Sequence, residues 1–305
     1  MRVTVTGAEE TLGLAAAQML LRAGHAVRAF VRDESRFRDL CRDPRVEVVE
    51  GDIRERADTA EGLAGSEAIV HCVDFPPREF LHNWDAIRHA LEALPPGGPF
   101  VYPGNLWVYR PPQGGRVGPD HTKDSPSRLG AVRADLEKAV TAQGGTVVHL
   151  PEVYGPGVRS GPTHDLFQRA LAGRTVYYPG NLDRPVEFLY VSDAARALIA
   201  PLGRISARGA DYTAPGYKVT TPRQFAALVF KAAARDPRIR SLPARLVRAL
   251  DLLHAERRAL RDLSYLIEQP ILLDGTRIRH ELGWVPEVDY PEGVRRTVRW
   301  MRATP

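Results

Sequence analysis

The sequence predicts an α/β fold, with a doubly wound parallel sheet of the Rossmann type and a smaller α-rich C-terminal substrate lobe. In the first half of the chain, short β-branched runs alternate with helical patterns, as in a parallel sheet covered on both faces. The first run leads into Thr6-Gly7-Ala8, which reads as a tight turn, and then into a helix rich in Ala and Leu. Helical patterns dominate after Tyr217. We therefore expect a ligand crevice at the carboxyl ends of the strands.

The elements of the first half follow in order along the chain. The first helix is expected to stop at Gly24, because glycine readily adopts the conformation that ends a helix. The expected strands are residues 1–6, 26–31, 46–50, 68–73, 100–102 and 146–150. The expected helices between them are residues 12–23, 35–41, 57–63, 84–93 and 127–143.

The second half has a looser pattern. The expected helices are residues 163–172, 192–202, 221–234, 243–253, 256–268 and 291–302, with one more opening near Thr276. The expected strands are residues 174–178 and 185–191, with a short apolar segment at 271–273. We predict a Rossmann-like domain over residues 1–156, its sheet completed by residues 185–202, and a mostly α-rich substrate-binding lobe over residues 157–305.

Composition limits the classes of partner. The net charge of +5 comes almost entirely from arginines, which are interleaved with acidic residues as in Arg54-Glu55-Arg56. This scattering is typical of a solvated surface, so we expect no nucleic-acid partner. No apolar run approaches the roughly 20 residues that span a bilayer, and the chain begins in a strand rather than a signal peptide. Two cysteines supply neither a disulfide framework nor a metal cluster. We expect a cytoplasmic protein with a small-molecule substrate, no metal and no membrane partner.

Several short motifs occur in a recognisable order. The turn T-G-A-x-x-x-L-G at residues 6–13 is followed by Gly51-Asp52-Ile53, by Y-G-P-G at 154–157, by F-L-Y-V-S-D at 188–193 and by L-G-W-V-P at 282–286. With these motifs the chain resembles the extended and atypical short-chain dehydrogenase/reductases, in particular the NAD-dependent epimerase/dehydratase family. The resemblance covers almost the whole chain. It implies a Rossmann fold and a homodimer formed through the helices at 84–93 and 127–143.

The residues that carry this family's hydride chemistry are replaced here. The resemblance assigns the catalytic serine or threonine to Asn105, and the tyrosine and lysine to Leu129 and Arg133. Leucine has no proton to exchange, and arginine stays charged at any relevant pH, so it can clamp an anion but is a poor acid–base catalyst. Asn105 can still stabilise an oxyanion. We expect the usual proton relay of the family to be lost.

The glycine turn also departs from the family. Glu10 stands where a glycine lets the backbone approach a pyrophosphate at the helix N-terminus. A carboxylate here, with Glu9 beside it, repels the pyrophosphate: two like charges about 4 Å apart repel by roughly 1 to 4 kcal/mol, which weakens nucleotide binding. Alternatively, Glu9 and Glu10 only complement the helix dipole. Arg32 lies where relatives that prefer NADP hold the 2′-phosphate. We expect no cofactor, or weakly bound NADP in preference to NAD. The candidate cofactor-binding residues are Gly7, Glu10, Gly13, Arg32, Asp52 and Ile53.

The candidate catalytic residues are Glu152, Asn105, Arg133 and Tyr109. Glu152 is the leading acid or base, because a carboxyl group near a buried turn can have a raised pKa; its alternative is a salt bridge to Arg133 or Arg159. Tyr109 either donates a hydroxyl near the space of the missing tyrosine or is a core aromatic.

The candidate substrate-binding residues are Asp74, Phe75, Tyr154 and His164. Asp74 follows the fourth strand, and its alternative role is to cap a helix. His164 opens a helix of the substrate lobe. His71 lies inside a strand, where a core histidine is expected.

Three functions are compatible with these residues. The first is an enzyme that has left hydride transfer and performs elimination, cyclisation or isomerisation on an oxygenated metabolite, a lyase, isomerase or cyclase rather than an oxidoreductase. The second is an atypical NADP-dependent reductase or epimerase in which Tyr109 or water delivers the proton. The third is a non-catalytic module that senses a nucleotide or metabolite.

Overall fold

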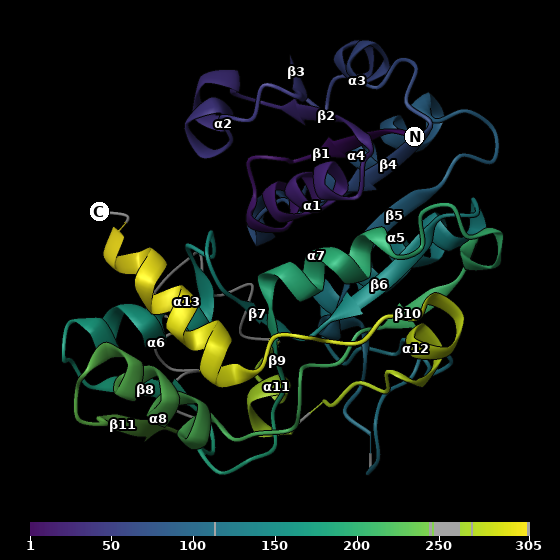
Figure 1. The fold of residues 1–305 in the computed structure, drawn as a ribbon. Coiled ribbons are helices and arrows are strands. Elements are labelled where there is room, and N and C mark those ends of the chain that lie inside the picture. The colour runs from purple at the N-terminus through teal and green to yellow at the C-terminus, as the bar shows by residue number, and fades with distance from the viewer. Residues whose placement is uncertain (113, 244–245, 247–262, 270, 304–305) are drawn as a thin grey trace.

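A computed structural model describes residues 1–112, 114–243, 246, 263–269 and 271–303. A parallel sheet with helices on both faces occupies one part of the molecule, and a smaller lobe of helices and short strands packs beside it (Figure 1). Among the described helices, none is long and apolar enough to cross a membrane.

Seven parallel strands form the main sheet, in the order β10-β6-β5-β4-β1-β2-β3. Strands buried on both faces, such as β4 and β6, are apolar or β-branched apart from one histidine each, as is typical of parallel sheets. The strand order reverses between β1 and β4, which places a ligand crevice at their carboxyl ends. The strands are β1 Arg2–Thr6, β2 Ala26–Val31, β3 Val46–Glu50, β4 Ala68–His71, β5 Phe100–Asn105, β6 Thr146–Leu150 and β10 Asp211–Thr213.

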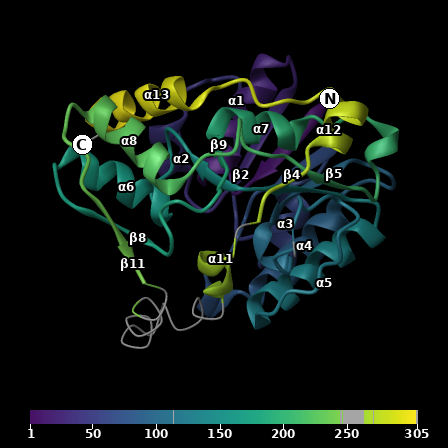
Figure 2. The ribbon, with the colours of Figure 1, turned by 90° about the horizontal axis from the view of Figure 1, so that it is seen from below.

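Two helical layers cover the sheet. Figure 2 shows α1 (Thr11–Arg22) and α7 (Val191–Ile199) on one face, and α3 (Arg56–Gly62), α4 (His82–Ala93) and α5 (Arg128–Ala142) on the other. Helices α1 and α7 pack directly against each other through buried alanines and leucines. The remaining elements of this part are α2 (Glu34–Leu40), α12 (Thr276–Leu282) and the 3₁₀ turns η1 (Pro77–Glu79), η2 (Leu106–Val108) and η3 (Ile205–Ala207).

The second lobe has its own aromatic core. Tyr154, Phe167, Phe188, Phe225 and Tyr290 are all buried, and their rings contact one another. Two small parallel pairs, β7 with β9 and β8 with β11, also belong to this lobe. The elements are β7 Glu152–Tyr154, α6 Gly161–Leu171, β8 Val176–Pro179, β9 Phe188–Tyr190, α8 Pro222–Ala233, β11 Ile239–Leu242, α11 Tyr265–Glu268 and α13 Tyr290–Ala303.

The doubly wound fold and its α-rich lobe confirm the prediction, but one strand assignment is wrong. Residues 185–202 do not complete the main sheet: β9 pairs with β7 in a separate sheet, and only α7 packs on the main one. The seventh strand is β10, a three-residue segment too short to show a strand pattern in the sequence. The predicted helix at 243–253 and most of that at 256–268 lie outside the described residues.

Candidate functional site

Two cavities open at the carboxyl edge of the main sheet, on either side of the point where the strand order reverses. The small cavity, of about 280 Å³, lies beside β1 and β2. The large cavity, of about 510 Å³, lies between β5, β6 and the second lobe. Asp74, just after β4, lines both cavities and marks where they adjoin. A ligand with two parts can therefore occupy them together.

The glycine turn at the small cavity keeps the shape that a dinucleotide phosphate requires. Gly7 has a left-handed φ of 65°, and a Cβ on Gly13 would lie 2.1 Å from the carbonyl oxygen of Gly7. Glu10 has an extended backbone that any residue adopts, is exposed, and makes no side-chain hydrogen bond to the start of α1. A helix start without such a cap can receive an anion. Glu10 therefore adds negative charge here without distorting the turn.

The small cavity contains most of the predicted cofactor-binding residues. Gly7, Glu10, Arg32 and Ile53 line it, and so does Phe75, which was expected to bind substrate. Asp52 does not line it, because its carboxylate is held by the Arg54 side chain, which lowers the pKa of Asp52.

The sequence left two roles open for Glu9: to add negative charge beside Glu10 against a pyrophosphate, or to complement the helix dipole. Its side chain is buried against the small cavity, and its Oε1 accepts a hydrogen bond from the backbone N–H of Arg32.

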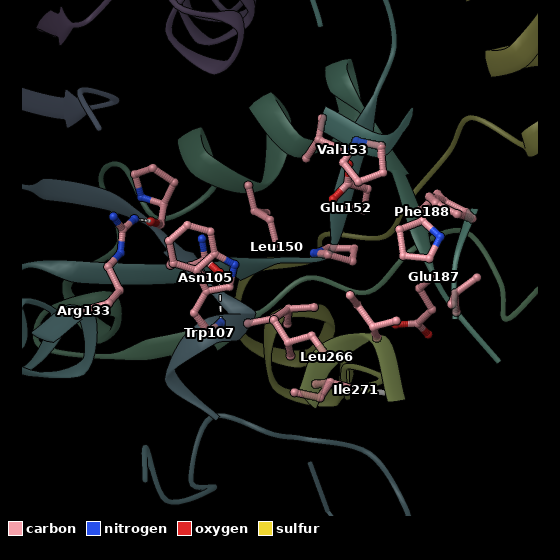
Figure 3. Close-up of a pocket in the computed structure, with 18 of the residues that line it drawn as sticks. Asn105, Trp107, Arg133, Leu150, Glu152, Val153, Glu187, Phe188, Leu266 and Ile271 are labelled. Carbon is pink, nitrogen blue, oxygen red and sulfur yellow. Dashed lines mark hydrogen bonds between the residues drawn. The ribbon is translucent and has the colours of Figure 1, made fainter. Parts of the chain in front are cut away.

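The walls of the large cavity are mostly apolar. Figure 3 shows Leu150, Val153, Phe188, Leu266 and Ile271 around it, contributed by β6, β7, β9, α11 and the segment that follows α11. Five prolines and Trp107 complete much of the wall. Such a surface fits a small apolar or aromatic molecule better than a heavily charged one.

Asn105, at the end of β5, faces the large cavity. Its side-chain oxygen accepts a hydrogen bond from the backbone N–H of Trp107 at 2.9 Å, which fixes the amide orientation. Its backbone N–H donates to Glu137 at 3.2 Å. The amide nitrogen of Asn105 makes no hydrogen bond to any of the described residues, so it is available to a ligand oxygen.

Arg133, assigned to the lysine position, lines the cavity, and two of its guanidinium nitrogens donate hydrogen bonds to the protein. It is 2% exposed; its Nη1 donates to Asp74 at 2.9 Å and its Nη2 to the carbonyl oxygen of Pro103 at 2.8 Å. Its guanidinium also lies over the ring of Tyr102. Burial alone would lower the pKa of Arg133, but Asp74, Tyr102 and Glu137 raise it overall. The group is a permanent cation whose Nη1 and Nη2 are bonded to the protein, whereas its buried Nε has no hydrogen-bond partner among the described residues.

A buried charge cluster surrounds Glu137, which the sequence reasoning did not single out. Its carboxylate lies 2.9 Å from Nε2 of His149, 3.0 Å from Nζ of Lys123 and 3.7 Å from Nε of Arg133. Burial would raise the pKa of Glu137, but these three groups hold it at about 2. Glu137 follows Arg133 by four residues on α5, a spacing that places both on one helix face and was visible in the sequence.

Among the described carboxylates that line the large cavity, Glu152 is the one without an ion pair, because Asp74 pairs with Arg133 and Glu187 with Arg116. Its side chain is exposed to the cavity, yet the surrounding walls exclude enough water to raise the pKa of its carboxyl group, an effect only partly offset by hydrogen bonds from Thr163. It pairs with neither Arg133 nor Arg159. Burial, together with nearby Glu152, raises the pKa of the Tyr178 hydroxyl to about 12, although Arg184 acts in the opposite direction. Both Tyr178 and Arg184 line the same cavity.

Three of the predicted catalytic and substrate-binding residues line neither cavity. Tyr109 is buried, and its hydroxyl lies 3.2 Å from Nδ1 of His149, so it belongs to the core. Tyr154 is buried in the aromatic cluster of the second lobe. His164 bonds to the carbonyl oxygen of Val158 at 2.9 Å. His71 is a core histidine as expected, and burial lowers its pKa to about 3.

Sequence comparisons identify two known family models in the chain. Residues 7–94 match the NAD(P)H-binding model, and residues 132–213 match that of the NAD dependent epimerase/dehydratase family. The chain is also similar to a 3-diazoavenalumate denitrifying reductase from a Streptomyces species, with 29% identity over 221 residues, 66% of this chain and 71% of that protein.

Solved structures with the same fold include two sugar-nucleotide enzymes. The dTDP-glucose 4,6-dehydratase from Streptomyces venezuelae, with NAD bound, has a TM-score of 0.81 at 21% identity and covers 100% of this chain and 98% of its own. The UDP-glucuronic acid 4-epimerase from Bacillus cereus, in complex with UDP-glucuronic acid and NAD, has a TM-score of 0.83 at 17% identity, with 100% of both chains covered.

These comparisons correct the expectation about the cofactor. We expected none, or weakly bound NADP, because Glu10 replaces the middle glycine. The NAD(P)H-binding model nevertheless matches residues 7–94, the segment that carries Glu10, and this match indicates a nicotinamide cofactor. The two solved structures named above, which share the fold, hold NAD. The physical reason is local: Glu10 is exposed and leaves the left-handed turn and the helix start intact. An exposed charge is screened by solvent and repels a phosphate less than a buried one.

Proposed function

We propose that the chain, whose residues 132–213 match the model of the NAD dependent epimerase/dehydratase family, is a nicotinamide-dependent reductase of a small, mostly apolar molecule. In this proposal the substrate occupies the large cavity, and Glu152 is the side chain that exchanges a proton with it. The single observation that carries the proposal is Glu152 itself, a carboxyl group with a raised pKa that is exposed to an apolar cavity and has no cationic partner among the described residues.

The residues around the small cavity suit the adenosine and phosphate part of the cofactor. The turn at Gly7 and the start of α1 would hold the pyrophosphate, and Ile53 would flank the adenine. When bound, the cofactor supplies the hydride. The chain's own contribution is to orient the two partners and to manage the proton.

On the substrate side, the polar groups that remain available are few. The amide nitrogen of Asn105 can donate a hydrogen bond to a substrate oxygen. The raised pKa of Glu152 keeps a larger fraction of its carboxyl protonated at a given pH than in an ordinary glutamate, so more of it can donate a proton. Arg133 positions Asp74 and the end of β5 through its bonds to Asp74 and Pro103. Leu129 contributes no proton, so acceptors that are already electron-poor suit this site best.

The similarity to a reductase supports this choice over an epimerase of sugar nucleotides. A nucleoside diphosphate carries two phosphates, whereas the basic side chains that line the large cavity are Arg133, which is engaged by the protein, and Arg184, whose Nη1 donates to the carbonyl oxygen of Leu266. The relative from Streptomyces is named for a diazo compound, so an aromatic electrophile is a reasonable acceptor to test first.

A second candidate function is proton transfer alone, in which Glu152 removes and returns a substrate proton during elimination, cyclisation or isomerisation. The same raised pKa and the absence of an ion pair among the described residues favour it. It differs from the reductase in that the nicotinamide cofactor is not oxidised during turnover.

Absorbance at 340 nm tests the proposal with NADH or NADPH and a panel of aromatic aldehydes, quinones and diazonium salts. We expect cofactor oxidation with at least one class, a fall of about 10²- to 10⁴-fold in Glu152→Gln, and partial retention in Glu152→Asp. Oxidation that is unaffected in Glu152→Gln would remove Glu152 from the mechanism. Deuterium uptake from D₂O into a substrate without cofactor oxidation would favour proton transfer, and nucleotide binding without either reaction would favour a sensor.

A further inference from the structure

One side chain beside the small cavity is buried with an unused hydrogen-bonding atom. Glu9 is 9% exposed and lines that cavity. Its Oε1 accepts a hydrogen bond from the backbone N–H of Arg32 at 3.1 Å, which ties the glycine turn to the end of β2. Its Oε2 is buried and has no hydrogen-bond partner among the described residues. Such an atom is costly unless a donor reaches it.

The position of Glu9 determines which donors can reach it. The bond to Arg32 places the carboxylate at the end of β2, between the turn at Gly7 and the residues that follow the strand. In a doubly wound fold, the ribose of the adenosine half lies at this place, and a carboxylate there bonds a ribose hydroxyl. A hydroxyl can donate to Oε2, whereas the oxygens of a phosphate at neutral pH only accept.

We infer that Glu9 determines cofactor specificity: its Oε2 accepts a hydrogen bond from a ribose hydroxyl and excludes a 2′-phosphate, so that the protein selects NAD(H) over NADP(H). The inference rests on the proposed function, since it assumes that a nicotinamide dinucleotide occupies the small cavity. It reverses the preference that Arg32 indicated from the sequence.

The charges near the ribose position differ in burial, and this decides between them. The Arg32 side chain is exposed, and it lies close enough to Asp52 to help lower the pKa of that carboxyl group. Its charge is therefore both screened by solvent and partly compensated by an acidic neighbour. Glu9 is buried, so its repulsion of a phosphate is screened much less. Glu10 lines the same cavity but is exposed and sits at the helix start, where both dinucleotides place the same pyrophosphate.

Binding measurements test the inference without any turnover. Isothermal titration calorimetry of the whole chain with NADH and with NADPH gives both dissociation constants, and the same titrations are repeated on two variants. Glu9→Gln keeps an oxygen for the N–H of Arg32 but removes the charge. Glu10→Gln is the matched control, because it removes the neighbouring exposed charge from the same turn. Thermal melting of each variant reports whether it folds.

For the wild-type protein, we expect NADH to bind at least about tenfold more tightly than NADPH. In Glu9→Gln the NADPH affinity should rise about tenfold and the preference should approach unity, whereas Glu10→Gln should shift both affinities together and keep their ratio. Equal affinities or a preference for NADPH in the wild type overturn the inference, as does an unchanged ratio in a folded Glu9→Gln. If that variant fails to fold, the wild-type ratio still decides. Binding of neither dinucleotide overturns the proposed function, and the inference with it.

Discussion

The small and the large cavity lie along one edge of the same sheet, but the charged side chains beside them differ in burial and in how far protein groups compensate their charge. Beside the small cavity, Glu9 keeps a buried oxygen unpartnered and Arg32 is exposed. Beside the large cavity, Arg133 and Glu137 are both buried, and their charges are compensated by protein groups. A residue that replaces a family residue is therefore not automatically available for chemistry. Arg133 has become a structural link, whereas Glu152, which is not ion-paired, faces the ligand space.

The largest effect expected from this contrast is on stability. Arg133→Met should lower the free energy of unfolding by about 3 to 5 kcal/mol, because it removes a buried cation and leaves its acidic partners with less compensation. The matched change Arg32→Met beside the small cavity should cost less than about 0.5 kcal/mol, since that side chain is exposed. Urea unfolding monitored by circular dichroism measures both. Similar losses in the two variants would remove the distinction between the cavities.

A somewhat smaller effect should appear as a pH dependence of the large-cavity cluster. The pKa of Glu137 is held at about 2 in the folded protein, below its usual 4.5. A depressed carboxyl pKa contributes stability that is complete above pH 4.5 and is lost as the pH falls toward 2. The contribution is on the order of 3 kcal/mol.

Urea unfolding at pH 5 and at pH 3 tests this dependence. The decrease between the two pH values should be smaller in Glu137→Gln than in the wild type, because the variant lacks the group that titrates. Parallel decreases in the two proteins would show that other carboxyl groups dominate the acid sensitivity.

The smallest effect concerns Tyr109, which the sequence offered as a proton donor and the structure places in the core. Tyr109→Phe removes its hydroxyl contact with His149 and should cost about 1 kcal/mol of stability. Turnover of any substrate identified for the wild type should stay within about twofold, since Tyr109 does not line the large cavity. A large loss of turnover at unchanged stability would return Tyr109 to the site.

The elements that the sequence predicted well are those with a local signature. Strands 26–31, 46–50 and 146–150 were predicted with their observed bounds, because each is a short run with several apolar or β-branched residues, a pattern typical of parallel strands. The turn at Gly7 followed from the demand for a left-handed residue and a close approach. The seventh strand, β10, was not predicted, because three residues are too few to show a hydrophobic periodicity. The roles of Glu9, Glu137 and Tyr178 were not predicted, because each depends on contacts with residues that are distant in the sequence.

Hydrophobic periodicity and the positions of glycines are local features of the chain. The sequence alone was therefore enough to predict the doubly wound fold and the edge of the sheet where ligands bind. Burial and partnership act between residues far apart in the chain. Arg133 and Asp74 are separated by 59 positions, and Lys123 and Asp211 by 88. Only the tertiary structure places acidic groups beside the Arg133 cation and exposes Glu152 to a cavity. It also buries an oxygen of Glu9 without a hydrogen-bond partner among the described residues. The pKa and the availability of a charged side chain depend on its exposure to water and on nearby opposite charges, and the residue type alone determines neither.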